Sequence, residues 1–267
     1  ALAGATLSAL GKNGSVLLSA GENISLDTKK LQSEKDMTAN AENYLRIKRG
    51  TALGTEIHVD GNISITVRND LKTRAATIAS KNSTASLAAG NDTALTAGRE
   101  TAEDHYGIRY KAGGLLSSTT ITVCTDTVVT SKVTGTNVSI AAKRNISFTA
   151  ADIATNHDVK IAAGRNFSAA STANYAHTEN FKKIEKSAIF SSGGINFTIG
   201  TQKTKTTHDS DAITQRGPSI AALGGNISIS AGENAHISSS NILAVKDATS
   251  WPRRYISTTR TTSTAMS

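Results

Sequence analysis

Short phrases of alternating apolar and polar residues recur along the chain. Each phrase opens with small, Gly or basic residues and an Asn or Asp, and then runs apolar-polar-apolar, as in Ala142-Lys143-Arg144-Asn145-Ile146-Ser147-Phe148. This alternation has the period of a β-strand, and the three- and four-residue spacing of a helix is missing. Asn, Asp and Gly tolerate the left-handed backbone of a tight corner. The pattern therefore predicts short strands joined by sharp corners.

The phrases are spaced regularly. Two phrases lie 8 residues apart within a unit, as Asn137 and Asn145 do, and the next unit begins 13 residues later at Asp158, so the repeat is 21 residues. Repeats of this length built from strands are typical of a parallel β-helix, in which each coil pairs with the coil before it. We expect a third short strand near Asp152-Ile153-Ala154 and near Asn241-Ile242-Leu243.

The predicted fold is therefore all-β, a right-handed parallel β-helix with two projecting β-hairpin insertions. Corner Asn side chains of successive coils are expected to stack into amide ladders. The alternation also predicts which side chains point inward. These are Ile24, Leu26, Ile63, Ile65, Val138, Ile140, Ile146, Phe148, Val159, Ile161, Ile227 and Ile229.

Two stretches interrupt the repeat. Both place a Gly-Gly pair, Gly113-Gly114 or Gly193-Gly194, beside alternating apolar residues, which is typical of a hairpin projecting from the rod. The expected organisation is an N-terminal edge (1–13), coils (14–98), a first hairpin (99–132), coils (133–171), a second hairpin (172–223), a coil (224–248) and an irregular tail (249–267).

Composition supports a stacked rod. Only 4% of the residues are aromatic, so the core must be built from Ile, Val, Leu and Ala. Cys124 is the only cysteine, which excludes an intrachain disulfide. The net charge of +8 is diffuse and favours weak attraction to acidic surfaces. The sequence has no apolar run long enough for a membrane helix, and it begins in mid-pattern without Met, so we expect a piece of a longer protein.

Candidate chemistry is sparse. His157-Asp158 and His208-Asp209 have the form of catalytic or metal-binding pairs, but we expect surface turn residues at both. Asn-x-Ser/Thr strings have the form of glycosylation acceptors, but a corner Asn followed by a strand Ser produces the same string. β-helical polysaccharide lyases need charged clusters with aromatic platforms, and Trp251, the only Trp, lies outside the repeats. We therefore expect no enzyme, no cofactor, no metal and no specific nucleic-acid partner.

The second interruption and the coil after it carry a resemblance. The segments 189–203 (Ile-Phe-Ser-Ser-Gly-Gly-Ile-Asn-Phe-Thr-Ile-Gly-Thr-Gln-Lys) and 223–232 (Leu-Gly-Gly-Asn-Ile-Ser-Ile-Ser-Ala-Gly) resemble the haemagglutinin repeat of large two-partner-secreted exoproteins. This repeat occurs in contact-dependent growth inhibition toxin-delivery proteins and in filamentous-haemagglutinin-like adhesins. The resemblance covers about residues 14–248. It implies a secreted, cell-surface filament, exported through an outer-membrane transporter partner.

What the resemblance implies about function leaves two hypotheses. In the first, the segment is a structural and delivery filament that helps a C-terminal toxin reach or cross the target cell's outer membrane. In the second, it is a fragment of an adhesin that binds host or neighbouring cells. The chain lacks the family's secretion domain and toxin, and the repeat breaks at Ala248-Thr249-Ser250-Trp251-Pro252, which suggests a truncated or frameshifted reading frame.

The second insertion is the predicted contact with a target-cell membrane or receptor. Apolar residues on a projecting hairpin are a liability unless they meet a partner, and basic residues favour acidic headgroups. Packing back onto the rod is the competing explanation. The candidate contact residues are Phe190, Ile195, Phe197, Ile199, Lys182 and Lys183.

Overall fold

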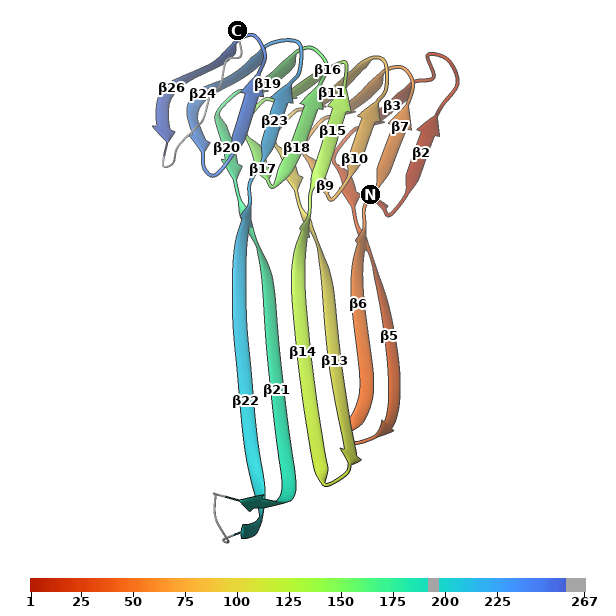
Figure 1. The fold of residues 1–267 in the computed structure, drawn as a ribbon. Helices are drawn as coiled ribbons and strands as arrows, with labels where there is room; N and C mark the ends of the chain where they lie inside the picture. Colours follow the sequence, from red (N-terminus) through yellow and green to blue (C-terminus); the bar gives the residue numbers. More distant parts are fainter. Residues whose placement is uncertain (192–196, 258–267) are drawn as a thin grey trace.

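The protein is a three-sided stack of β-coils from which a separate sheet projects (Figure 1). The computed structural model describes residues 1–191 and 197–257. Every pairing within the stack is parallel, and every pairing within the projecting sheet is antiparallel. No helix in these described ranges is long and apolar enough to span a membrane. A parallel β-helix with hairpins, as predicted, is confirmed.

Each coil contributes one strand to each of three faces. The first face consists of β2 (Thr6–Ala9), β7 (Glu56–Val59), β10 (Thr77–Ser80), β15 (Ser131–Gly135), β18 (Ala151–Thr155), β23 (Ser219–Ala222) and β25 (Asn241–Ala244). The second consists of β3 (Val16–Ala20), β8 (Ile63–Val67), β11 (Thr84–Ala89), β16 (Asn137–Ala142), β19 (Val159–Ala163) and the first half of β24 (Ile227–Ile237). The third consists of β1 (Leu2–Ala3), β4 (Ile24–Asp27), β9 (Leu71–Arg74), β12 (Thr93–Thr96), β17 (Ile146–Thr149), β20 (Asn166–Ala170) and the second half of β24.

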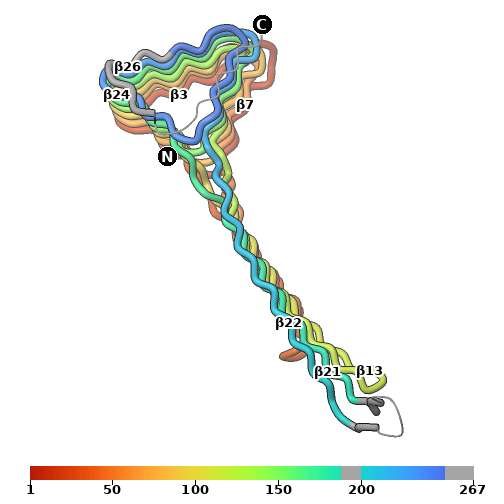
Figure 2. Tube along the Cα trace, turned by 60° about the vertical axis from the view of Figure 1, so that its left-hand side comes forward, coloured from red at the N-terminus to blue at the C-terminus, as the bar shows by residue number. Residues whose placement is uncertain are grey.

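The core is one continuous column inside the three faces. Seen along the stack, the coils superpose and enclose it (Figure 2). Of the predicted inward residues, all are buried except Ile24, which is partly buried. The register places aliphatic residues of successive coils next to each other: Ile65 lies beside Leu87, Leu87 beside Ile140, and Ile140 beside Ile161. Burial of such aliphatic columns is the main source of stability in a fold with few aromatic residues.

The predicted amide ladder is present at the corner between the second and third faces. Asn166 donates from Nδ2 to Oδ1 of Asn145 at 3.0 Å, and Asn234 donates in the same way to Asn166 at 2.9 Å. Asn145 in turn donates to Oδ1 of Asp92 at 2.9 Å. The side chains thus repeat the hydrogen bonding of the backbone and hold successive corners at one spacing.

The projecting sheet consists of three hairpins rather than the two predicted. They are β5 (Lys29–Asn40) with β6 (Asn43–Leu53), β13 (Gly98–Ala112) with β14 (Leu115–Val129), and β21 (Thr172–Ser191) with β22 (Phe197–Arg216). Their order in the sheet is β5-β6-β13-β14-β21-β22. The prediction of uninterrupted coils over 14–98 is therefore wrong. Residues 29–53 lack a Gly-Gly turn, and Asn40 instead caps the turn by accepting from the backbone N–H groups of Glu42 and Asn43.

The two ends of the chain also differ from expectation. Residues 2–9, expected as an edge, already pair with the stack through β1 and β2. At the other end, β26 (Ala248–Ser257) pairs with β24 across two faces, with a register shift between Ala231 and Asn234. The expectation of an irregular tail from 249 is therefore wrong as far as Ser257, because parallel pairing depends on backbone groups more than on the apolar alternation used to predict it. The rest of that tail lies outside the described residues.

Candidate interaction surface on the projecting sheet

The projecting sheet is a single layer. It extends from one corner of the stack, and no second layer covers either of its faces in the described part of the chain (Figure 2). The edge strands are open to solvent: all of β5 is exposed, as is β22 from 201 to 216. Because strand residues alternate between faces, the register divides its side chains into two sets. We call these the Tyr106 face and the His177 face.

The Tyr106 face carries an apolar patch over four strands. One cross-strand row contains Met37, Leu45, Tyr106 and Ile121, in that order across the sheet. Tyr106 is 37% exposed and Met37 is 46% exposed. Further apolar residues of the same face are Ile47, Ile108, Tyr110, Val123 and Ile184. Apolar patches that reach across several strands without a covering layer are typical of surfaces that meet a partner or a membrane.

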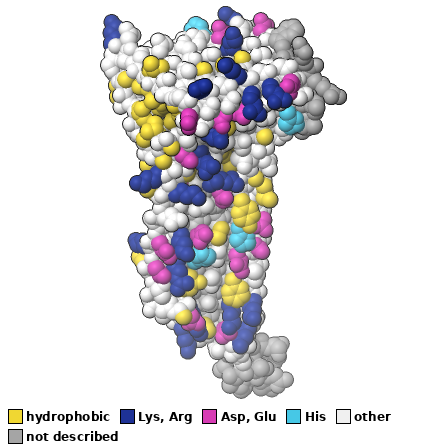
Figure 3. Space-filling view, turned by 180° about the vertical axis from the view of Figure 1, so that it is seen from behind, with side chains coloured by type: hydrophobic (Ala, Val, Ile, Leu, Met, Phe, Trp, Pro, Cys, Tyr) yellow, Lys and Arg dark blue, Asp and Glu magenta, His cyan; other side chains and the backbone are white. Residues whose placement is uncertain are grey.

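The end of the sheet far from the stack is basic. Its segments 107–120, 181–187 and 200–207 contain seven basic side chains and one acidic one, Glu185. The register brings Arg109, Lys183 and Lys205 into one cross-strand row of the His177 face. Figure 3 shows Lys and Arg side chains at this end of the sheet as well as over the stack and along the sheet. The basic residues of this distal end are Arg109, Lys111, Lys182, Lys183, Lys186, Lys203 and Lys205.

Glu185 balances only part of this charge. Lys183 Nζ lies 2.6 Å from its Oε1, and Lys203 Nζ lies 3.7 Å from the same atom. The hydrogen bond from Lys183 lowers the pKa of Glu185, and the charges of Lys183 and Lys203 add to the effect. Arg109 pairs with Glu42 at the tip of the first hairpin. The distal end thus keeps a positive excess suited to phosphate or carboxylate groups.

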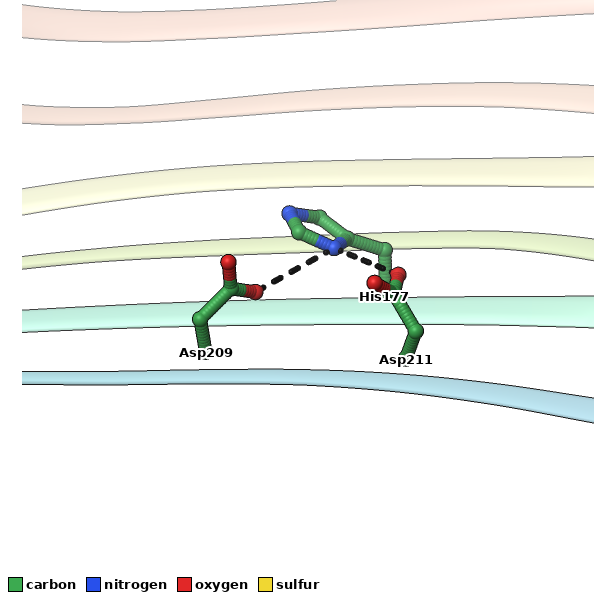
Figure 4. Close-up of side chains that lie close together, drawn as sticks. All are labelled: His177, Asp209 and Asp211. Atoms are coloured by element: carbon green, nitrogen blue, oxygen red, sulfur yellow. Dashed lines mark hydrogen bonds and ion pairs between the residues drawn. The ribbon is translucent and has the colours of Figure 1, made fainter.

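A second group of charges lies nearer the stack on the His177 face. His177 Nδ1 is 2.9 Å from Asp211 Oδ1 and 3.6 Å from Asp209 Oδ1 (Figure 4). The hydrogen bond with Asp211 raises the pKa of His177, while hydrogen bonds from Tyr175 and His177 lower the pKa of Asp211. Among the described residues, this is the group whose ligand atoms are close enough, all within 4.8 Å, for one divalent cation. The distances themselves are those of an ion pair.

The structure separates the residues that the sequence proposed as contacts. Lys182 and Lys183 are consecutive on β21 and therefore point to opposite faces. The backbone of Phe190 pairs with Thr198, that of Phe197 with Ser191, and that of Ile199 with Ile189. Ile195 lies outside the described residues. These assignments therefore stay predictions.

The two histidine pairs of the sequence have different positions. His157 and Asp158 lie at the corner between β18 and β19, as expected of turn residues. His208 and Asp209 instead lie within β22, so the expectation of a turn is wrong there. The error arises because polar residues with no apolar alternation are easily interpreted as a loop. In a single-layer sheet, a strand needs no apolar face.

Sequence reasoning missed most of the distal cluster and all of the apolar patch. Arg109, Lys111, Lys203 and Lys205 are far from Lys182 in sequence and become neighbours only through the hairpin register. A signal for the second hairpin's two-faced character was present. The segment Tyr106-Gly107-Ile108-Arg109-Tyr110-Lys111 alternates apolar residues with basic ones, as a two-faced strand does.

Comparison with known proteins identifies the repeat. The hemagglutinin repeat family matches residues 112–249, which include the returning strand β14 of the second hairpin, the whole third hairpin, and the coils between and after them. The chain belongs to this family. It is 34% identical over 170 residues to a tRNA nuclease CdiA of Escherichia coli (strain STEC_O31), a match that covers 61% of this chain and 5% of that protein. It is 33% identical over 202 residues to a 16S rRNA endonuclease CdiA of Enterobacter cloacae, covering 73% of this chain and 6% of that protein.

These relatives are much longer than the chain. A tRNA nuclease CdiA-2 of Burkholderia pseudomallei is 24% identical over 202 residues, again 73% of this chain and 6% of that protein. No solved structure matches the chain significantly. The matched part of the chain therefore spans about one twentieth of the length of these relatives. As a member of the hemagglutinin repeat family, it is a filament segment of a secreted, cell-surface exoprotein.

Proposed function

We propose that this rod segment presents the projecting sheet to the outer membrane of a target cell and so helps a toxin of its parent protein to be delivered. The observation that carries this proposal is the sheet itself, a single layer with an apolar patch on one face and a basic distal end. A rod needs neither feature for its own packing. The relatives that it matches are named as toxins and nucleases, which favours delivery over adhesion alone.

The acidic groups of the target are the phosphates and carboxylates of lipopolysaccharide or of anionic lipid. Each Lys or Arg close to an anionic surface contributes about 1 kcal/mol to binding, and salt weakens the attraction. The apolar patch then contacts the acyl region or an outer-membrane protein. In this proposal Lys182 and Lys183 make polar contacts, and Phe190, Ile195, Phe197 and Ile199 make apolar ones. The parent is exported through the outer-membrane transporter of a two-partner pathway.

Binding is tested first with vesicles that contain lipopolysaccharide, compared with vesicles of phosphatidylcholine alone. The triple variant Lys182→Glu, Lys186→Glu, Lys205→Glu changes the distal end. The matched control, Lys132→Glu, Lys160→Glu, Lys246→Glu, makes the same charge change on exposed positions of the stack. We expect the first variant to bind at least about tenfold more weakly and to lose most of the salt dependence. Equal binding by both variants would contradict the proposal.

Delivery is tested in an exoprotein that carries this segment, with Phe190→Ser and Phe197→Ser. Secretion and attachment to target cells should persist while delivery of the toxin fails. Unchanged delivery would show that these residues are not contacts. Failure of secretion or folding would place them in the packing of the hairpin instead.

A further inference from the structure

The corner between the third face and the first face is closed in two alternating ways. At four levels the chain turns through one residue with left-handed backbone: Gly4 (φ 57°), Ala75 (φ 45°), Ala150 (φ 47°) and Ser239 (φ 49°). At the levels between them a hairpin leaves instead, after β4, after β12 and after β20. No two hairpins in the described chain occupy successive coils. The alternation holds from Gly4 to Ser239 without exception.

Strand spacing explains the alternation. Neighbouring strands lie about 4.7–4.9 Å apart in any sheet, so the coils and the projecting sheet rise at the same rate. Each hairpin sends one strand out from the end of a coil and returns the other to the start of the next coil. Every coil from β2 to β24 therefore supplies one strand to the projecting sheet. A coil that has received a returning strand has no space at its level for an outgoing one, and its corner must close directly.

The free edge at the growing end of this sheet is β22. Its 20 residues pair with β21 without a register shift, the strand contains no proline, and its outer part, 201–216, is exposed throughout. Proteins normally protect long flat edges with bulges, proline or a covering segment, because unpaired N–H and C=O groups are a template for another strand. The opposite edge, β5, is shorter, and its pairing has a register shift between Thr38 and Asn40.

We propose that the edge of β22 binds the outgoing strand of a further hairpin of the same polypeptide, carried by the coil that contains β25 and β26. That coil is the next level, since β25 pairs with β23 and β26 with β24. An outgoing strand runs antiparallel to β22, as β13 does to β6 and β21 does to β14. The relatives are about twelve times as long as this chain, so further units of two coils and a hairpin are available in proteins of this kind.

The side chains of β22 indicate which residues that strand should carry. Two cross-strand neighbours on the His177 face pair opposite charges, Lys48 with Glu34 and Glu185 with Lys203, whereas Lys183 lies opposite Lys205. A strand suited to this edge places an acidic residue beside Lys203 and a basic one beside Asp211, as β21 does with Glu185 and His177. Thr and Ser elsewhere would suit a sheet without a covering layer.

The test lengthens the full chain by one unit. Residues after Ser257 are replaced by a second copy of residues 170–249, which carries β21, β22 and the coil after them. Ser257 is equivalent to Ala169 through their common partner Ile237, so the copy enters in register. In the matched control, Ser238–Ser240 are replaced by a copy of residues 170–218, which places the same hairpin one level too early. Amide exchange of the original β22 is measured in the parent and in both variants.

We expect the half of the β22 amides that point away from β21 to exchange at least about 100-fold more slowly in the lengthened chain and to be unchanged in the control. The proposal would be overturned if the added strands are protected from exchange but the β22 amides of the lengthened chain exchange as fast as in the parent. It would also be overturned if the β22 amides are protected equally in the control. If the first copy prevents folding, a copy of residues 27–89, with the shorter hairpin, replaces it under the same criteria. A parent chain that dimerises with β22 already protected would show a second copy as occupant, which also overturns the proposal.

Discussion

The contact between Phe148 and Phe167 offers the sharpest test of how the core is held together. The two rings belong to successive coils, are each 1% exposed, and meet edge to face with centroids 5.3 Å apart and planes at 87°. The register gives each ring a smaller partner in the adjacent coil: Phe148 lies beside Ala169, and Ile146 lies beside Phe167. Replacing either ring by Ala removes its buried area and leaves a cavity, a loss of about 3–5 kcal/mol in the free energy of unfolding.

The two substitutions should not add. An edge-to-face pair contributes about 0.5–1.5 kcal/mol beyond burial, so the double variant Phe148→Ala, Phe167→Ala should lose less than the sum of the single variants by about that amount. Urea unfolding followed by circular dichroism gives the three free energies. Amide exchange of β17 and β20 shows whether the loss is local to these coils, since stacked repeats can open separately.

A matched control for the burial effect lies in the projecting sheet. Phe181 is half-buried between Thr120 and Thr207, with no layer above it. Phe181→Ala should lose only about 1 kcal/mol or less, as expected of one cross-strand contact. Losses below that value for both core rings, or an equal loss at Phe181, would refute the idea that burial inside the stack holds the coils together.

Other expectations concern the corners and the charges. Asn166→Ala removes the hydrogen bonds to Asn145 and from Asn234 and should destabilise the protein by about 1–2 kcal/mol in urea unfolding, whereas the exposed Asn82→Ala, with one such bond, should lose less. Gly54→Ala would place Cβ against the carbonyl oxygen of Ala75 and should destabilise the protein by about 1–3 kcal/mol. Gly21→Ala, with open space around it, should change stability by about 0.5 kcal/mol or less, and equal effects of the two substitutions would contradict the crowding at Gly54. Asp211→Asn should lower the pKa of His177 toward its ordinary value of about 6.5 in an NMR titration. Because the folded pKa of His177 is raised, its contribution to stability is complete below the unfolded pKa and disappears as pH rises through the folded pKa, and His177→Gln should remove that dependence.

The stack could be predicted from sequence because its rules are local and repeated. Asn145 marks a corner, Ile146 and Phe148 point inward, and the 21-residue spacing repeats that assignment from coil to coil. The same reasoning found the last two hairpins from their Gly-Gly pairs; Gly113-Gly114 forms the turn between β13 and β14, and Gly193-Gly194 lies outside the described residues. It missed the first hairpin, because Lys29–Asn40 is mostly polar, with Leu31 and Met37 six residues apart, and its turn depends on the side chain of Asn40.

The surface of the sheet could not be predicted in the same way. Which residues meet there depends on the register between hairpins that are about 70 residues apart, and no periodicity encodes it. Arg109 and Lys183 lie on either side of Ser118 in one cross-strand row. Nothing in the sequence around Ser118 indicates that it pairs with these two residues. The cluster of His177, Asp209 and Asp211 likewise depends on the offset between β21 and β22.

The hairpin strands lengthen along the chain, from 12 residues in β5 to 15 in β13 and 20 in β21, while the coils keep their size. At about 3.4 Å for each residue, the last hairpin extends some 17 Å farther than the one before it. Length along the rod is fixed by the number of coils, whereas reach away from the rod is fixed by residues added in pairs at a hairpin tip. The two dimensions can therefore vary independently, and a lineage can change how far its filament reaches sideways without altering a single core position.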